Sequence, residues 1–266
     1  MRSLIITVML LGGIVTMWNI EWYWLIIALI YSVVVNDIFC HRICSHGMFD
    51  IDTKSKTYKI MTWLASMDMS FGPVVWTVKY HNLHHIHSDN GPEDVMNWRY
   101  HWYSTAICSP IPPREVMPSD YDEYTKKQWI KHEKLLSDPW TDWCCRNQCA
   151  IAIGSFLVLA IVCPIILFKV IFVGRVLLSI TIGVASIAGH IEHFPLSYRN
   201  FNTRDTTSNN LVLHYLFLGL FAGVLQNNHH GQPKSIRPNP RWFEFDTSYP
   251  FVLTLKYLME NKPAPE

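Results

Sequence analysis

The stretch His81-Asn82-Leu83-His84-His85 is an HxxHH box, and the other elements of the chain can be placed around it. Residues three and four apart share a helix face, so its histidines can project from one side of a helix. Two further boxes accompany it, His41-Arg42-Ile43-Cys44-Ser45-His46 (HxxxxH) and Gln226-Asn227-Asn228-His229-His230 (QxxHH). Seven of the thirteen histidines lie in these three boxes, which indicates one shared site.

The box histidines are candidate metal ligands. Neutral imidazole binds iron, zinc, copper and nickel, and about eight imidazoles exceed the four positions of a tetrahedral zinc site. Their number suits two metal ions. His190, where the last predicted span ends, is a further candidate, while His41 and His46, five apart, fit a helix end or a break. The other histidines are predicted to lie outside the site: His87, His101, His132, His193 and His214.

The composition indicates a membrane protein. Hydrophobic residues make up 50% of the chain and charged residues only 16%, whereas soluble domains carry about 25%. The formal net charge of +1 gives no bulk basic field, so nucleic acid is not an expected partner. The seven cysteines form no CxxC pair, and we expect reduced, buried thiols rather than a disulfide framework.

Four apolar stretches predict four transmembrane helices in two hairpins, at about residues 4–18, 21–38, 148–168 and 170–189. A signal peptide over Leu4–Met17 is the alternative, but no cleavage site separates it from the next apolar run. Two hairpins return the chain to its starting side, so every box falls on the same side. We therefore expect a single domain over residues 1–266, an all-α integral membrane protein with a cytosolic helical cap that holds the histidines.

Shorter elements complete the predicted cap. Ser55–Met69 reads as a helix at the membrane interface, and Gly72-Pro73 separates it from the helix that carries HxxHH. A Pro-rich loop over residues 103–118 and a helix capped by Ser119 follow, and Ser137-Asp138-Pro139 predicts another helix start. Leu216–Leu225 is apolar but only 10 residues long, which favours a buried or re-entrant segment.

Several other metal and cofactor sites are excluded by the residues. The chain has no HExxH, so a zincin is not supported. No Glu is followed three residues later by His, which excludes the di-iron carboxylate bundle. The glycines form no GxGxxG motif for a dinucleotide.

With its three ordered boxes and two apolar hairpins, the chain resembles the membrane fatty acid desaturases over roughly residues 20–258. Further stretches carry the resemblance to their acyl-lipid and acyl-CoA branch: Gly72-Pro73 with Trp76, His87-Ser88-Asp89, Asn202-Thr203-Arg204-Asp205, Asn209-Asn210 and Arg241-Trp242-Phe243-Glu244-Phe245-Asp246.

The resemblance implies a centre of two non-haem iron ions (Fe²⁺/Fe³⁺) that uses dioxygen and two electrons to remove two hydrogens from an acyl chain. It implies an acyl-lipid or acyl-CoA substrate in the membrane lipid and an external electron donor, either a ferredoxin or a b-type cytochrome. One iron would be bound by His41, His46, His81, His85 and His230. The other would be bound by His84, His190, His229 and Gln226.

Three residues depart from the family pattern. Gln226 stands where this branch usually has His, Ser186 replaces an Asn that holds a metal-bound water, and Ala222 lies where a Glu is common. Loss of a residue that supports a metal ligand can lower metal affinity or activity by about 10–100-fold. We therefore expect weaker metal binding than in typical relatives.

Two alternatives remain open from the residues. A histidine-box hydroxylase or related oxygenase would share the ligands, because the outcome depends on how the acyl chain lies. A non-catalytic membrane protein that binds metal or lipid is the alternative from another class. A desaturase would need an apolar tunnel to place its substrate, with the interface helix, the spans and Leu216–Leu225 as its expected walls.

Overall fold

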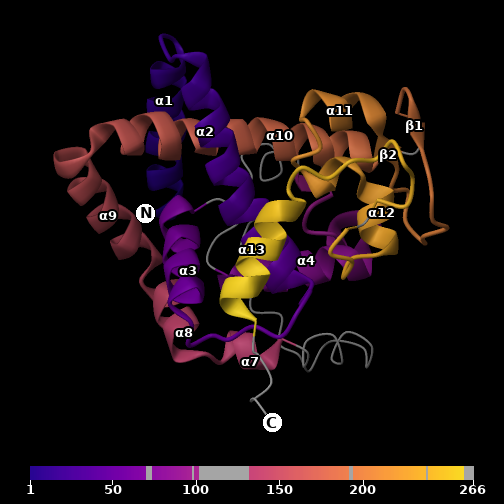
Figure 1. Ribbon diagram of the computed structural model, residues 1–266, viewed down its shortest axis with the longest axis horizontal. Helices are drawn as coiled ribbons and strands as arrows, with labels where there is room; N and C mark the ends of the chain where they lie inside the picture. The colour runs from indigo at the N-terminus through magenta and orange to yellow at the C-terminus, as the bar shows by residue number, and fades with distance from the viewer. Residues whose placement is uncertain (70–73, 98, 102–131, 192–193, 238, 261–266) are drawn as a thin grey trace.

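The structure is a computed structural model that describes residues 1–69, 74–97, 99–101, 132–191, 194–237 and 239–260 (Figure 1). The described parts are mostly helical, with one antiparallel pair of two-residue strands, β1 (Ser197–Tyr198) and β2 (Asn209–Asn210). The expected helical class is therefore confirmed in outline. Gly72-Pro73, the loop over residues 103–118 and the helix after Ser119 lie outside the described residues.

Two long apolar helices could cross a membrane by length and composition. The first joins α2 (Trp22–Ser32) to the π-helix η1 (Val33–Ser45), and the second joins η4 (Ile166–Phe172) to α10 (Val173–Gly189). Each has 24 residues, more than the roughly 20 that a bilayer requires.

The other two predicted spans are less clear. α1 (Arg2–Met17) is apolar but has only 16 residues. α9 (Gln148–Val162) passes the same test only together with α8 (Pro139–Arg146), from which it is bent by 76°. Among the described residues the structure thus supports two spans, or three if the bent pair counts as one, and the arrangement of four spans stays a prediction.

Small residues allow α10 and η4 to pass close to the first two helices (Figure 1). A Cβ on Gly13 would lie 2.4 Å from the carbonyl oxygen of Phe172, and a Cβ on Gly174 would lie 3.0 Å from that of Ala28. Such small residues are how membrane helices reach close contact. The glycine in α1 is therefore a packing site rather than a helix break.

The predicted cap helices begin at the expected residues. α3 (Lys56–Asp68) starts at Ser55, whose hydroxyl accepts a hydrogen bond from the Tyr58 N–H at 3.1 Å. α8 starts at Asp138, whose carboxylate accepts one from the Thr141 N–H at 2.9 Å. Three further elements belong to this part of the chain: α4 (Val74–His87), η2 (Gly91–Glu93) and α7 (Glu133–Leu136).

After α10 the chain forms short elements that surround the third box. These are β1, β2, α11 (Leu211–Leu216), η5 (Ala222–Val224), α12 (Gln226–Gly231) and α13 (Tyr249–Met259). Leu220, Phe221, Val224 and Leu225 are buried in the main core, so the second half of the Leu216–Leu225 run is a buried segment, as predicted. The described cysteines are free thiols.

Candidate metal centre

The first box lies on a π-helix. Residues hydrogen-bonded five apart are neighbours across one turn of such a helix, and π-turns occur frequently at functional sites. η1 carries His41, and His46 caps its C-terminal end, with the two ring centroids 5.3 Å apart. The five-residue spacing that fits no single α-helical face is therefore accommodated by this helix type and by its end.

The second box divides its histidines between two clusters. His81 and His85, four apart on α4, approach each other with Nε2 atoms 2.9 Å apart. His84 lies on the same helix but contacts a different group, with ring centroids 4.9 Å from His190 and 5.2 Å from His230.

The arrangement of the third box differs from the ligand partition implied by the resemblance. His229 lies among His41, His46 and His81, while His230 lies with His84 and His190. The expected partition placed these two residues the other way round. Consecutive residues on an α-helix point about 100° apart, so α12 can send one ring to each cluster, and its orientation decides which.

The first cluster brings five Nε2 atoms together. His229 Nε2 lies 3.0 Å from that of His41, 3.2 Å from that of His46 and 3.0 Å from that of His85. His46 and His81 are joined in the same way at 2.8 Å. Two nitrogens bound side by side to one ion at about 2.1 Å would be about 3 Å apart. The spacing therefore fits ligands of a single metal ion.

The second cluster contains His84, His190 and His230, whose candidate ligand atoms lie within 4.8 Å of one another. His190 caps the C-terminal end of α10, as expected of the residue where the span ends. The Nε2 atom of His230 is buried and has no hydrogen-bond partner among the described residues. The ring of His85 stacks on His230 with centroids 4.2 Å apart, so the two clusters adjoin.

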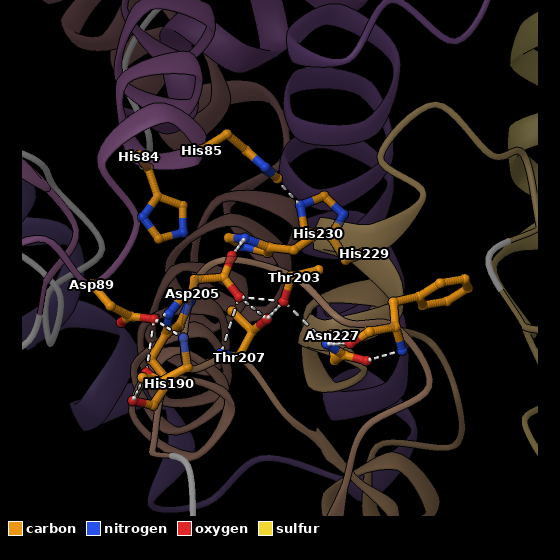
Figure 2. Close-up of polar contacts among 12 residues, drawn as sticks. His84, His85, Asp89, His190, Thr203, Asp205, Thr207, Asn227, His229 and His230 are labelled. Atoms are coloured by element: carbon orange, nitrogen blue, oxygen red, sulfur yellow. Dashed lines mark hydrogen bonds and ion pairs between the residues drawn. The ribbon is translucent and has the colours of Figure 1, made fainter.

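Four aspartates hold the other ring nitrogen of four histidines, and Figure 2 shows two of these pairs, His190 with Asp89 and His230 with Asp205. Each Nδ1 atom is paired with one carboxylate: His41 with Asp37 at 2.9 Å, His84 with Asp94 at 2.8 Å, His190 with Asp89 at 3.0 Å and His230 with Asp205 at 2.7 Å. A carboxylate on one nitrogen fixes the ring orientation and the tautomer, and leaves the other nitrogen for a metal. This pattern is typical of metal-binding histidines.

These aspartates were not predicted from the sequence to be partners of the histidines. Asp37 precedes His41 by four residues, and a carboxylate inside an apolar helix was a usable signal. Asp89 and Asp205 lie in stretches that carry the resemblance, but nothing local links them to His190 and His230. Their pairing depends on the fold.

The carboxylates are themselves hydrogen-bonded. Asp205 accepts from the hydroxyl of Thr203 at 2.6 Å and from that of Thr207. Asp89 accepts from the N–H and the hydroxyl of Thr206, both at 2.8 Å. Burial opposes ionisation of Asp89, but its hydrogen bonds to His190 and Thr206 outweigh this and lower its pKa to about 2. Burial opposes ionisation of Asp205 in the same way, but its hydrogen bonds to His230, Thr203 and Thr207 outweigh this and hold its pKa well below the ordinary value, so both groups are charged acceptors at neutral pH.

Burial keeps most of the clustered imidazoles neutral. It lowers the pKa of His46, His81, His85 and His229 well below the ordinary value, and neighbouring histidines lower it further. Burial also acts on His84, but the charge and the hydrogen bond of Asp94 outweigh it and raise that pKa. Neutral imidazole is the form that binds metal ions.

Gln226 has an unusual environment. Its side chain fills the space beside Gly189, the residue that precedes His190. A Cβ on Gly189 would lie only 2.3 Å from Gln226 Cγ. The amide oxygen is buried without a hydrogen-bond partner among the described residues. An oxygen in this condition fits a metal ligand. The side chains of Ser186 and Ala222, the other two departures, lie outside the described residues.

The remaining histidines lie in neither cluster. His101 Nε2 contacts the carbonyl oxygen of Pro92 at 3.2 Å, and the buried ring of His214 lies 4.7 Å from that of Phe245. His87 and His132 join none of the candidate ligand groups in the described parts of the chain. His193 lies outside the described residues.

Two cavities adjoin these elements. One, of about 1110 Å³, reaches the clusters at His46, His85 and His230. The other, of about 710 Å³, lies between α3, α9 and η4 with Tyr31 of α2 at its wall, and its lining is almost wholly apolar. No residue of Leu216–Leu225 lines the apolar cavity among the described residues, unlike the expected tunnel.

Comparison with known proteins agrees with this geometry. A sequence model described as fatty acid desaturase matches residues 16–238. A protein of Nostoc sp. (strain 36) described as sn-2 palmitoyl-lipid 9-desaturase is 26% identical over 221 residues, which cover 82% of this chain and 72% of that protein.

Proposed function

The chain belongs to the fatty acid desaturase family, and on that premise we propose that it inserts a double bond into the acyl chain of a membrane lipid. Two hydrogens leave adjacent methylenes, and with two electrons and two protons they reduce one dioxygen to two waters. The observation that carries this proposal is the convergence of eight imidazoles in two adjoining clusters, with aspartates on four of them.

The proposed ligands are the nine residues singled out by the boxes and the last span. One metal ion would be held by the first cluster, His41, His46, His81, His85 and His229. The other would be held by the second cluster, His84, His190 and His230, with Gln226 as an oxygen ligand. The His230 Nε2 and Gln226 oxygen atoms, which have no hydrogen-bond partner in the described parts of the chain, support this division, because a buried polar atom without a partner is unfavourable.

Iron is the proposed metal. When bound, non-haem iron supplies reactivity with dioxygen toward an unactivated C–H bond, which no amino-acid side chain offers. The residues of the chain orient the ligands. Aspartates accept the Nδ1 protons of four histidines and so direct the Nε2 atoms of these rings toward the proposed metal positions: His41, His84, His190 and His230. The buried setting keeps bulk water from most of these rings.

The acyl chain has to be held in one position to give one double bond. We propose that it enters from the bilayer through the apolar cavity between α3, α9 and η4, whose walls include the expected interface helix and spans. A lipid-linked substrate is favoured by the Nostoc relative, whose description specifies a palmitoyl-lipid.

The proposed setting is a multi-pass membrane protein with its histidines on the cytosolic side. Electrons would come from a separate carrier, a ferredoxin or a b-type cytochrome. The cavity of about 1110 Å³ that reaches His46, His85 and His230 supports entry of small reactants there.

The test is expression in a host that lacks its own desaturase, with an electron carrier supplied and total fatty acids analysed by gas chromatography–mass spectrometry. A new unsaturated acid that is absent with the His84→Ala variant would support the proposal and place the double bond. A hydroxylated acid would assign the hydroxylase alternative instead. Purified protein that binds less than one iron per chain after reconstitution would contradict the metal assignment.

A further inference from the structure

The stretch Arg241–Asp246 carries part of the family resemblance but contributes no ligand to either cluster. In the structure it continues through Ser248 as an irregular segment that leads from the third box into α13, and we call residues Arg241–Ser248 the strap. Two acidic side chains of the strap point inward. Glu244 is 1% exposed and the side chain of Asp246 is 6% exposed.

Asp246 binds the arginine of the first box. Arg42, which follows His41 on η1 and is 1% exposed, contacts Asp246 Oδ2 through Nη2 at 3.2 Å. Its Nη1 donates to the hydroxyl of Ser248 at 2.5 Å, and that hydroxyl donates to the other oxygen of Asp246 at 2.5 Å. A buried guanidinium requires a nearby carboxylate, so this contact ties η1 to the strap.

Glu244 is connected to the third box. Its Oε1 accepts hydrogen bonds from the Tyr198 hydroxyl at 2.5 Å and from Asn200 Nδ2 at 2.7 Å. The same Asn200 amide donates to Asn228 Oδ1 at 2.7 Å, and Asn228 directly precedes His229. Glu244 therefore holds, through one amide, the helix that carries the third box.

We infer that the strap positions the metal centre, by fixing the first and third boxes relative to each other; this rests on the proposed metal-binding function. Glu244 and Asp246 are two residues apart, so one short segment reaches both boxes. Its two contacts set where His229 lies relative to His41 and His46, whose Nε2 atoms approach it at 3.0 and 3.2 Å. Glu244, Asp246 and Arg42 are positioning residues.

The chemistry of the first cluster explains why such a device is needed. Several neutral imidazoles that direct ring nitrogens at one point repel one another until a cation lies between them. The Nδ1 of His41 is bonded to Asp37, which leaves its Nε2 as a lone pair aimed at His229. Contacts outside the cluster must therefore hold the rings together before the metal binds, and a preorganised site binds more tightly.

The test measures metal binding rather than turnover. Full-length protein is purified in detergent, stripped of metal and titrated with Co²⁺, whose visible absorption reports coordination by nitrogen ligands. We expect Asp246→Asn and Glu244→Gln to weaken Co²⁺ binding about tenfold or more, in the range found for residues that orient metal ligands. The control is Asp142→Asn, which removes the exposed pair with Arg146 at 2.8 Å and should leave Co²⁺ affinity unchanged.

A second variant and a second readout separate positioning from stability. Arg42→Lys keeps the charge but loses the fork that contacts Asp246 and Ser248 together, so we expect intermediate Co²⁺ affinity and an altered absorption spectrum. Thermal unfolding of the metal-free variants should show a folded protein at the titration temperature. Wild-type Co²⁺ affinity and spectrum in all three folded variants would overturn the inference. Because no turnover is measured, absence of desaturation would contradict only the proposed reaction.

Discussion

At the scale of single residues, the histidines and their aspartates act as pairs. An imidazole that loses its carboxylate can rotate or present the wrong tautomer, although its own chemistry is unchanged. His230 is the clearest case, because Asp205 holds its Nδ1 at 2.7 Å and its Nε2 is otherwise unpartnered among the described residues.

Replacing Asp205 with Asn tests this pairing. The amide keeps the size of the side chain but loses the charge that orients His230, so we expect metal affinity to fall by about 10–100-fold. Equilibrium dialysis followed by metal analysis measures the change. Asn replacement at Asp142, which pairs with Arg146 at an exposed site, should have no effect. Equal affinity in the Asp205 and Asp142 variants would contradict the role of the pair.

The assignment of the third box gives a second prediction. His229→Ala should resemble His41→Ala, because both rings belong to the first cluster, and His230→Ala should resemble His84→Ala. Metal content and Mössbauer spectra of iron-loaded variants would show which of two iron signals each change removes. The opposite pairing, His229 with His84, would favour the partition implied by the family resemblance over the one in this structure.

At the scale of elements, helix type and helix packing place the ligands. η1 is a π-helix within an otherwise α-helical stretch, and Ser45 donates through its hydroxyl to the carbonyl oxygen of Cys40, five residues earlier. This local winding brings His41 and His46 to one site. The apolar helices approach one another closely at glycines, α1 against η4 and α10 at Gly13, and that contact can be tested.

Gly13→Ala and Gly154→Ala form a matched pair in two apolar helices. A Cβ on Gly13 would lie 2.4 Å from the Phe172 carbonyl oxygen, whereas nothing lies within 4 Å of one on Gly154. We expect Gly13→Ala to cost about 1–3 kcal/mol through overpacking. Gly154→Ala should be neutral or stabilise the helix by up to about 1 kcal/mol. Thermal unfolding in detergent compares them, and equal stability of both variants would mean that α1 does not pack against η4 and α10 this closely.

At the scale of the whole molecule, segments from both halves of the chain assemble one site. η1, α4, the end of α10 and α12 each supply candidate ligands, and the strap contacts both η1 and the segment that holds α12. Because these imidazoles are buried together, the free energy of unfolding depends on pH. A histidine held neutral by burial binds fewer protons when folded than when unfolded, so folding is opposed wherever the unfolded form is protonated.

The metal-free protein should therefore lose stability in mild acid. The pKa of His230 is lowered by burial to about 4, from an ordinary value near 6.5. Because of His230, the free energy of unfolding should rise with pH between about 4 and 6.5 and stay level above that range. The lowered pKa values of His46, His81 and His229 act in the same direction. Thermal unfolding across that range measures this. A flat profile would show that these rings are not buried as neutral groups.

Several features could be predicted from the sequence alone: candidate ligands of the imidazole type, the helix starts at Ser55 and Asp138, the mostly helical class and the family. The family model over residues 16–238 confirms the last of these. These features depend on spacing and burial within a few residues, and local geometry follows from such patterns. The three boxes single out eight candidate ligands, and the end of the last predicted span adds His190. Within the second and third boxes, spacings of three and four residues define a helix face.

Which distant groups meet depends on the packing of the folded chain. Asp89 and His190 are 101 residues apart, and Arg42 and Asp246 are 204 apart, so no local pattern joins them. The orientation of α12 sends His229 to one cluster and His230 to the other, although adjacent histidines look equivalent in the sequence. These contacts form when packed helices and loops bring residues together that are far apart in the sequence. The periodicity of the sequence therefore does not predict them.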